Sequence, residues 1–213
     1  MLLVGALAAG LLVGPVSVPF GGTLAEIADR LPLVSIDSGL DDRQAAIVWE
    51  LRLPRVLLGA MVGAALSVSG AAYQGVFRNP LADPYLLGVA AGAGLGATLV
   101  IVGGGSIGLI PVAAFGGAVA AVVVAYALGS IGAGPRSGAT LILAGVAVAA
   151  FFTAAQTFVQ QQNADSVREV FTWILGRLST SGWGEVAVLA PYAAVGIFVI
   201  LLHRRLLDVL AVG

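Results

Sequence analysis

The sequence predicts an all-α fold, a polytopic bundle of about six transmembrane helices. Of its 213 residues 59% are hydrophobic and only 10% are charged, whereas a soluble domain carries about 25% charged residues. Long intervals contain no charged side chain, and 30 glycines are spread along the chain. Too few charges remain to cover a surface that faces water, so lipid is the expected solvent.

The charge-free intervals define the expected spans, because a helix needs roughly 20 apolar residues to cross a hydrocarbon core. The longest interval has room for two crossings, with a turn at residues 103–106 between them. The spans are expected at residues 1–20, 55–77, 84–102, 107–131, 138–160 and 186–203. The first run could also be a cleaved signal peptide, but it lacks a basic n-region, so a retained helix is the preferred interpretation.

Two polar segments, residues 21–50 and 161–185, are expected on the membrane side opposite the termini. Arginines alone do not set the orientation, since four lie on the side of the termini and six on the other. Acidic residues outnumber arginines on the side of the long segments. This balance favours cytoplasmic termini, with both long segments extracytoplasmic.

Glycine spacing indicates how the helices pack. Gly59 and Gly63 are four residues apart, and Gly88, Gly92 and Gly96 continue that spacing along another span. Small residues let helix backbones approach closely in lipid. We expect these glycines to form tight helix contacts; the alternative is that the second set keeps a helix slim beside a passage.

Missing residue types exclude whole classes of function. The chain has no lysine, so it cannot form the GxxxxGK phosphate loop, and the glycine run at 92–96 lies in an apolar span. No acidic residue lies in a predicted span, and the single histidine, His203, ends the last one. Cysteine is absent, and no basic cluster is present for nucleic acid. We therefore expect no catalytic residue, no metal site, no directly bound cofactor and no nucleic-acid partner.

What remains is a passive helical body in membrane lipid that another protein must move, which describes a permease subunit. Several ordered motifs carry a family likeness: LRLPR at 51–55, VGAAL at 62–66 with Ser69, Gly70 and Gln74, RNPLADP at 78–84 with Leu87 and Gly88, LAGVA at 143–147, and WILG at 173–176 followed by Leu178, Ser179 and Trp183. This pattern resembles FecCD-type permeases, the membrane subunits of ABC importers for iron-siderophore complexes, haem and cobalamin. The cobalamin permeases are among the proteins that it resembles.

The resemblance implies an ABC type II importer permease fold, which has about ten spans in the family. It implies location in the bacterial cytoplasmic (inner) membrane with cytoplasmic termini. Its partners would be ABC ATPase subunits that bind ATP, an extracytoplasmic substrate-binding protein and a second permease subunit in a homo- or heterodimer. The cargo would be a metal chelate, an iron-siderophore first, with haem or cobalamin as alternatives.

Residues 1–213 are then expected to form a single permease domain that stops before the ATPase-coupling helices. Residues 206–213 resemble the start of the segment that docks on the ATPase. Two other functions remain open: a channel or facilitator that needs no ATP, and a truncated remnant that transports nothing.

The resemblance also implies roles for individual arginine and glutamine residues. Arg52 and Arg55, which share a helix face, would be exposed and would meet acidic residues of the binding protein; the alternative is anchoring at the membrane interface. Gln156, Gln160 and Gln161 are candidate lining residues of the translocation path, and the last two could equally mark the entry of a solvated loop.

The resemblance further implies that the loop at 78–84 is a cytoplasmic gate, through Asn79, Pro80 and Leu81. Pro80 and Pro84 cannot continue a helix, so they hold the loop in a defined shape. Leu81 could plug a pore that Asn79 keeps wettable. The alternative is a rigid interhelical turn without a gating role.

Overall fold

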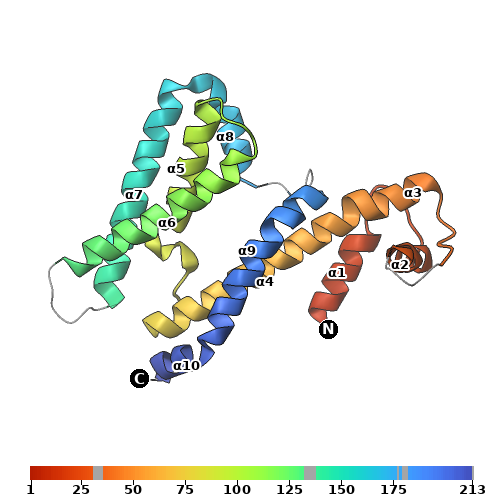
Figure 1. The fold of residues 1–213 in the computed structure, drawn as a ribbon, viewed down its shortest axis with the longest axis horizontal. Coiled ribbons are helices and arrows are strands. Elements are labelled where there is room, and N and C mark those ends of the chain that lie inside the picture. The colour runs from red at the N-terminus through yellow and green to blue at the C-terminus, as the bar shows by residue number, and fades with distance from the viewer. Residues whose placement is uncertain (31–35, 132–137, 177, 179–181, 213) are drawn as a thin grey trace. The chain divides into compact units, whose positions relative to one another are not determined.

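The computed structural model describes residues 1–30, 36–131, 138–176, 178 and 182–212, and every regular element in these ranges is a helix (Figure 1). The chain divides into two compact units. Residues 1–68 and 177–204 form the first, and residues 69–176 and 205–213 form the second. The all-helical prediction is confirmed.

The first unit contains the chain's N-terminal helices and one later helix. Its elements are α1 (Leu2–Leu12), α2 (Phe20–Asp29), α3 (Asp42–Ala46), the π-helical segment η1 (Ile47–Arg52), the first part of α4 (Leu53–Phe77), and α9 (Trp183–Leu202). Helix α1 ends where Val13 turns to an extended conformation, just before Gly14 and Pro15. Proline disfavours a helical conformation in the residue before it, so the helix is shorter than the predicted span at 1–20.

Elements α3, η1 and α4 form one continuous helix of 36 residues, Asp42–Phe77, which begins earlier than the predicted boundary at residue 55. Asp41 starts it with a capping box: its carboxylate accepts from the Gln44 backbone N–H at 2.7 Å, and the Gln44 side chain accepts from the Asp41 N–H. The end of the segment expected to be extracytoplasmic, residues 21–50, is therefore helical.

Pro54 explains the π-helical turn within this long helix. Proline has no N–H, and its ring clashes with the carbonyl four residues earlier in a regular α-helix. The Leu53 N–H bonds instead to the Val48 carbonyl, five residues back. This wider turn makes room for a buried Pro54 inside the helix, where the sequence suggested a helix start.

The second unit is built around three helices that pack against one another, α5, α6 and α7. Its elements are η2 (Pro84–Leu87), α5 (Val89–Val102), α6 (Leu109–Ser130), α7 (Gly138–Gln162), η3 (Ala164–Ser166), α8 (Val167–Ile174) and most of α10 (Arg204–Val212). Small apolar residues fill the core. They form two clusters: Ala97, Ile101, Ile110, Ala114 and Val170, and Ala121, Ala125 and Val148.

The crossing of α5 and α6 brings two backbones into contact. A Cβ added at Gly92 would collide with the carbonyl oxygen of Gly117, and one added at Gly96 would collide with that of Ala113. Gly88 lies before the helix, at its N-cap, with φ 73°, and an added Cβ there would stand 3.2 Å from the Ala149 nitrogen.

The other predicted glycine pair makes looser contacts. An added Cβ at Gly59 would meet Leu178 Cδ1 at an ordinary 3.8 Å, and none of the described atoms lies within 4 Å of one at Gly63. The sequence spacing of these two glycines resembles that of Gly92 and Gly96. Spacing alone therefore did not distinguish a close crossing from an open helix face.

Within the residues that the structure describes, four helices are long and apolar enough to cross a membrane: Asp42–Phe77, Leu109–Ser130, Gly138–Gln162 and Trp183–Leu202. These correspond to four of the six expected spans. The expected spans at 1–20 and 84–102 are shorter apolar helices, Leu2–Leu12 and Val89–Val102. The second is shortened because Pro84 starts a separate 3-10 turn and Gly88, in a left-handed conformation, separates that turn from α5.

Candidate functional site

The loop between α4 and η2 has a defined backbone, held by its own side chains. Arg78 ends α4 with a positive φ of 49°. The side-chain oxygen of Asn79 accepts from the Leu81 N–H at 2.9 Å, and the Asp83 carboxylate accepts from the Tyr85 N–H at 2.7 Å, where it caps η2. The loop is therefore a shaped connection that depends on its Asx residues.

Leu81 lies at the tip of this loop and is 85% exposed, while the next residue, Ala82, is buried. An apolar side chain held outward in this way makes little contact within its own chain. The geometry places Asn79, Pro80 and Leu81 together at one loop tip, as the gate prediction requires. Whether the tip closes a passage stays a prediction.

Arg78 joins this loop to the C-terminal helix of the same unit. Its Nε donates to the Leu210 carbonyl oxygen at 2.6 Å. Leu210 lies in the last turn of α10, where backbone carbonyls have no partner within the helix, and a cation is favourable at that end of the helix dipole. This hydrogen bond therefore connects the start of the loop to the end of α10.

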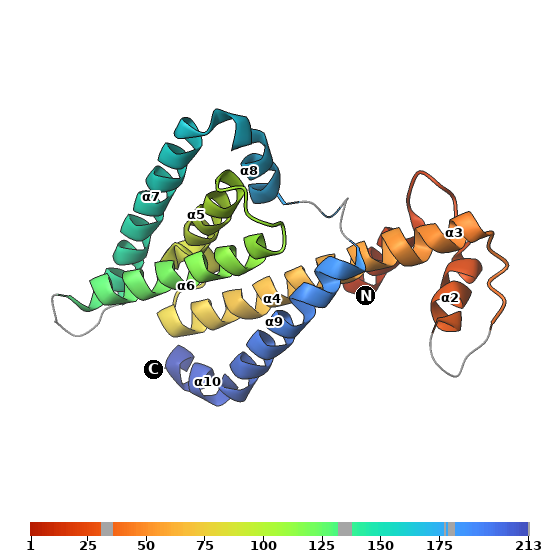
Figure 2. The ribbon, with the colours of Figure 1, turned by 45° about the horizontal axis from the view of Figure 1, so that its top comes forward.

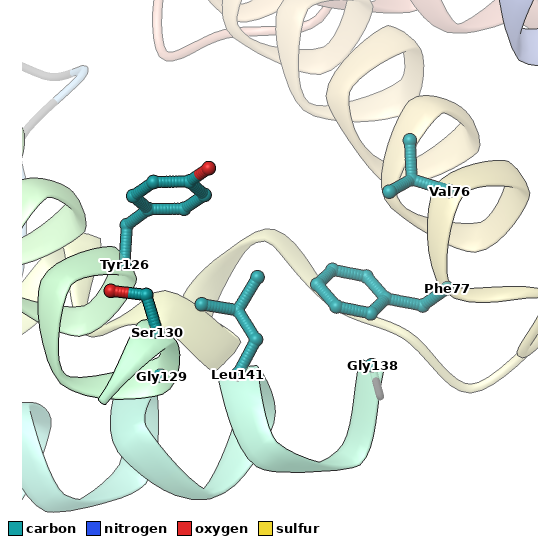
Figure 3. Close-up of a pocket in the computed structure, with 7 residues that line it drawn as sticks. All are labelled: Val76, Phe77, Tyr126, Gly129, Ser130, Gly138 and Leu141. Atoms are coloured by element: carbon teal, nitrogen blue, oxygen red, sulfur yellow. The ribbon is translucent and has the colours of Figure 1, made fainter. Parts of the chain in front are cut away.

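A half-open apolar cavity of about 200 Å³ lies at the end of α4 (Figure 3). It is lined by Val76, Phe77, Tyr126, Gly129, Ser130, Gly138 and Leu141, from the ends of α4 and α6 and the start of α7. The Ser130 hydroxyl donates to the Ala127 carbonyl at 2.6 Å. The lining offers two hydroxyl groups and no charge, so it suits an apolar group and offers no catalytic set.

Helix α7 carries a second, more open concavity. Of the three glutamines predicted to line the path, only Gln161 lies in it. This face contains Val146, Ala149, Ala150, Thr153, Ala154, Thr157, Phe158 and Gln161. Gln161 is exposed there, whereas the Gln156 amide oxygen lies against α5, 2.7 Å from where a Cβ on Gly94 would stand. Gln160 is half-buried on the Gln156 side.

Thr153 and Thr157 share the open face of α7 with Gln161, and the sequence analysis missed them. The Thr157 hydroxyl donates to the Thr153 carbonyl at 2.9 Å, within the helix. The signal was present, because these polar residues recur every fourth position and so share one face. Isolated threonines in an apolar run did not stand out beside the glutamines.

Arg52 is buried, so the expectation that its side chain is exposed is wrong, while its role in docking a binding protein stays a prediction. Its Nη1 donates to the carbonyls of Leu11 at 2.8 Å and Leu12 at 3.0 Å, and its Nη2 donates to that of Val16. It is 7% exposed. The physical reason is that the end of α1 leaves carbonyls without partners in an apolar setting, and the fork of Arg52 satisfies them. Arg55 is half-buried.

Two tryptophans tie the long helix to the start of α9. The rings of Trp49 and Trp183 lie 5.0 Å apart at 42°, and Trp183 Nε1 donates to the Trp49 carbonyl at 3.0 Å. The Arg30 guanidinium stands 5.4 Å from the Trp49 ring centre. No sequence signal pairs residues so far apart. Trp173, in α8, packs instead against the core cluster of α5 and α6.

The described residues contain no group of three or more His, Asp or Glu side chains that could hold a metal ion. The features available for function are therefore a shaped loop, an arginine link to α10, two concavities and apolar helix faces. They offer no nucleophile or paired acid and base.

Comparison with solved structures places this architecture among ABC transporters. The fold matches a metal-chelate type ABC transporter in an inward-facing conformation with a TM-score of 0.81 at 25% identity, covering 100% of this chain and 62% of that one.

Relatives of known name agree with that match. The chain is 34% identical over 219 residues to the cobalamin import permease BtuC of Halobacterium salinarum, covering 92% of this chain and 58% of the relative. It is 33% identical to the Fe(3+)-citrate import permease YfmD of Bacillus subtilis, covering 91% and 57%. It is 37% identical to the hemin transport permease HmuU of Yersinia pestis, covering 78% and 52%.

The chain thus spans little more than half the length of these relatives. The FecCD transport family matches residues 2–213, which is nearly the entire chain. The resemblance seen in the ordered motifs is confirmed, and the chain belongs to the FecCD transport family.

Proposed function

We propose that this chain is the membrane-spanning part of a permease that imports a metal chelate, driven by ATP on a partner ABC ATPase. The carrying observation is the loop at residues 78–83, whose apolar tip is linked through Arg78 to α10. The named relatives import cobalamin, Fe(3+)-citrate and haemin. This permease breaks no bond; it changes the access of its cargo.

The loop acts as the cytoplasmic gate in this proposal. Asn79 holds the backbone at the tip through its bond to the Leu81 N–H, so Leu81 swings with the loop instead of moving separately. Because Arg78 bonds to the Leu210 carbonyl, a displacement of α10 by an ATPase moves the tip. The gate residues are then Asn79, Pro80 and Leu81.

The open face of α7 is the candidate wall of the path. It presents Thr153, Thr157 and Gln161 among apolar residues. A chelate already surrounds its metal with ligands, so the path needs no metal-binding groups of its own. Gln156 faces α5 and, with Gln160, would act by positioning the helix.

The other partners follow from the same proposal. A binding protein would deliver the chelate on the side opposite the gate, and a second permease subunit, the same or different, would complete the path. Of the two arginines first considered for docking, Arg55 carries this role, because Arg52 is committed to the end of α1. The chain would lie in a bacterial cytoplasmic membrane with its termini on the cytoplasmic side.

Thiol labelling at the loop tip tests the gate. The chain has no cysteine, so Leu81→Cys introduces the single cysteine of this subunit in the assembled transporter. We expect its labelling rate to change when ATP is added, because α10 pulls on the loop. Tyr85→Cys, in η2 and also exposed, is the control and should label equally with and without nucleotide. Equal rates at position 81 would identify a rigid turn.

Uptake into vesicles tests the cargo and the energy source. We propose an iron-siderophore as the first chelate, and labelled haem and cobalamin are compared with it. Uptake that requires both ATP and the ATPase supports the proposal. Uptake without the ATPase identifies a facilitator, and no uptake of any chelate by the complete assembly identifies a remnant.

A further inference from the structure

Helix α2 has its polar and apolar faces arranged in the reverse of a helix in water. Phe20 and Leu24, one turn apart, are 57% and 50% exposed, whereas Thr23 and Glu26 are 1% and 5% exposed. A surface helix of a soluble protein turns its apolar stripe inward. Here the apolar stripe points outward and a carboxylate is turned in.

The inward-facing polar groups of α2 are fully engaged. Glu26 accepts from Arg30 Nε at 3.2 Å and from the Ser38 hydroxyl at 2.9 Å, and the Thr23 hydroxyl donates to the Pro19 carbonyl at 3.1 Å. Two of these bonds join residues of the helix to its own caps, so rotating α2 to hide Phe20 and Leu24 would break only the bond from Ser38, and it would expose the buried Thr23 and Glu26. The Ser38 bond and the burial of these two polar side chains therefore favour the outward apolar face.

The residues around α2 indicate its depth relative to the membrane. Arg30, at its C-terminal end, stands over Trp49, and Trp49 stacks on Trp183, the first residue of the crossing helix α9. Tryptophans prefer the boundary between membrane and water. Within the first unit, α2 also lies across the direction of the long helix that α3 begins (Figure 2).

We propose that α2 is an interfacial helix that inserts Phe20 and Leu24 into the boundary between lipid headgroups and acyl chains. The occupant is lipid, because α1, the apolar helix that precedes α2 in the same unit, is also exposed, with Leu2, Leu3 and Val4 at 92%, 67% and 68%. An in-plane helix with an apolar face on the lipid side is a known mode of membrane attachment. This role is independent of which chelate is carried.

The test uses single cysteines in the chain reconstituted in lipid nanodiscs. Phe20→Cys and Leu24→Cys each receive an environment-sensitive fluorophore, and Asp42→Cys, exposed at the start of α3, is the matched control. We expect emission at positions 20 and 24 to shift to shorter wavelength and to be lost when spin-labelled lipid is included. The label at position 42 should respond instead to a water-soluble quencher.

Two results would overturn the proposal. Quenching from water at both 20 and 24 places this face in solvent. A blue-shifted label that spin-labelled lipid does not quench places it against protein, such as a second copy. Using two positions protects the test against one variant that folds poorly, and the unchanged tryptophan emission of each variant checks its fold.

Discussion

The α5–α6 crossing and the region around α1 hold their helices together in opposite ways. Between α5 and α6, Gly92 and Gly117 remove the side chains, so the backbones touch directly. Around α1, a single long side chain, Arg52, reaches across and bonds to three carbonyls. In lipid, apolar contact between helices gains little from the hydrophobic effect, so both regions rely on close packing or on polar bonds.

The length of each helix explains why one region uses close backbone packing and the other uses side-chain hydrogen bonds. Helix α6 is long and apolar enough to span a membrane, and a spanning helix satisfies its backbone groups internally, so it needs only a partner surface that fits closely. Helix α1 stops at Leu12, so its carbonyls need donors from elsewhere. Added side-chain volume should therefore destabilise the α5–α6 crossing, whereas loss of hydrogen-bond donors should destabilise the region around α1.

The largest effect is expected at the α5–α6 crossing. Gly92→Ala places a methyl group against the Gly117 carbonyl. Because a backbone carbonyl cannot rotate away as a side chain can, the free energy of unfolding should fall by about 3 kcal/mol, the upper range for overpacking. Thermal unfolding in detergent measures it. Gly116→Ala, with open space around its Cβ position, is the control; equal losses for the two would refute direct backbone contact.

A smaller loss is expected when the donors of Arg52 are removed. Arg52→Gln leaves carbonyls at the end of α1 without partners, at a cost of about 2 kcal/mol. Amide exchange should rise in α1 and stay unchanged in α6. Arg43→Gln, in exposed α3, is the comparison variant. If exchange in α1 did not change, another group would satisfy these carbonyls.

A still smaller effect is expected at the tryptophan pair. Trp183→Phe keeps an aromatic ring near Trp49 but loses the bond from Nε1 to its carbonyl, which should cost about 1 kcal/mol. Trp183→Leu also loses the ring contact, so its melting temperature should fall further. The same melting temperature for both variants would assign no stability to the ring contact.

The smallest effect on stability is expected at Arg78. Arg78→Gln removes an exposed bond to the Leu210 carbonyl, so global unfolding should change by less than about 1 kcal/mol. Amide exchange in α10 should nevertheless rise, and in the assembled transporter the ATP response of a label at position 81 should fall. A large drop in melting temperature would show that the link is structural.

Much of the fold was readable because charge is expensive in lipid. Among the described residues, the charge-free intervals located the four helices long enough to span a membrane and the two shorter apolar helices, and the ordered motifs led to the correct family. Helix starts were less predictable: Pro54 suggested a first turn, but the helix accommodates it through a π turn. Local sequence shows that proline disturbs a helix but does not show whether the helix continues around it.

The candidate site also contains features that the sequence predicts and features that it does not. The loop at 78–83 was predictable from its Asn, Asp and Pro residues, whose preferences are local. Its link to α10, the burial of Arg52 and the separation of Gln156 from Gln161 were not, because each depends on a residue far away in the chain.

The sequence by itself determined that this chain crosses lipid, that its helices pack through small residues and that it belongs to a permease family, because composition and local motifs express those properties directly. Only the tertiary structure decided which glycines touch a backbone, which arginine is buried and which face of α2 is exposed. The physical reason is that these outcomes depend on which distant groups meet, and helical periodicity specifies a face without specifying its partner.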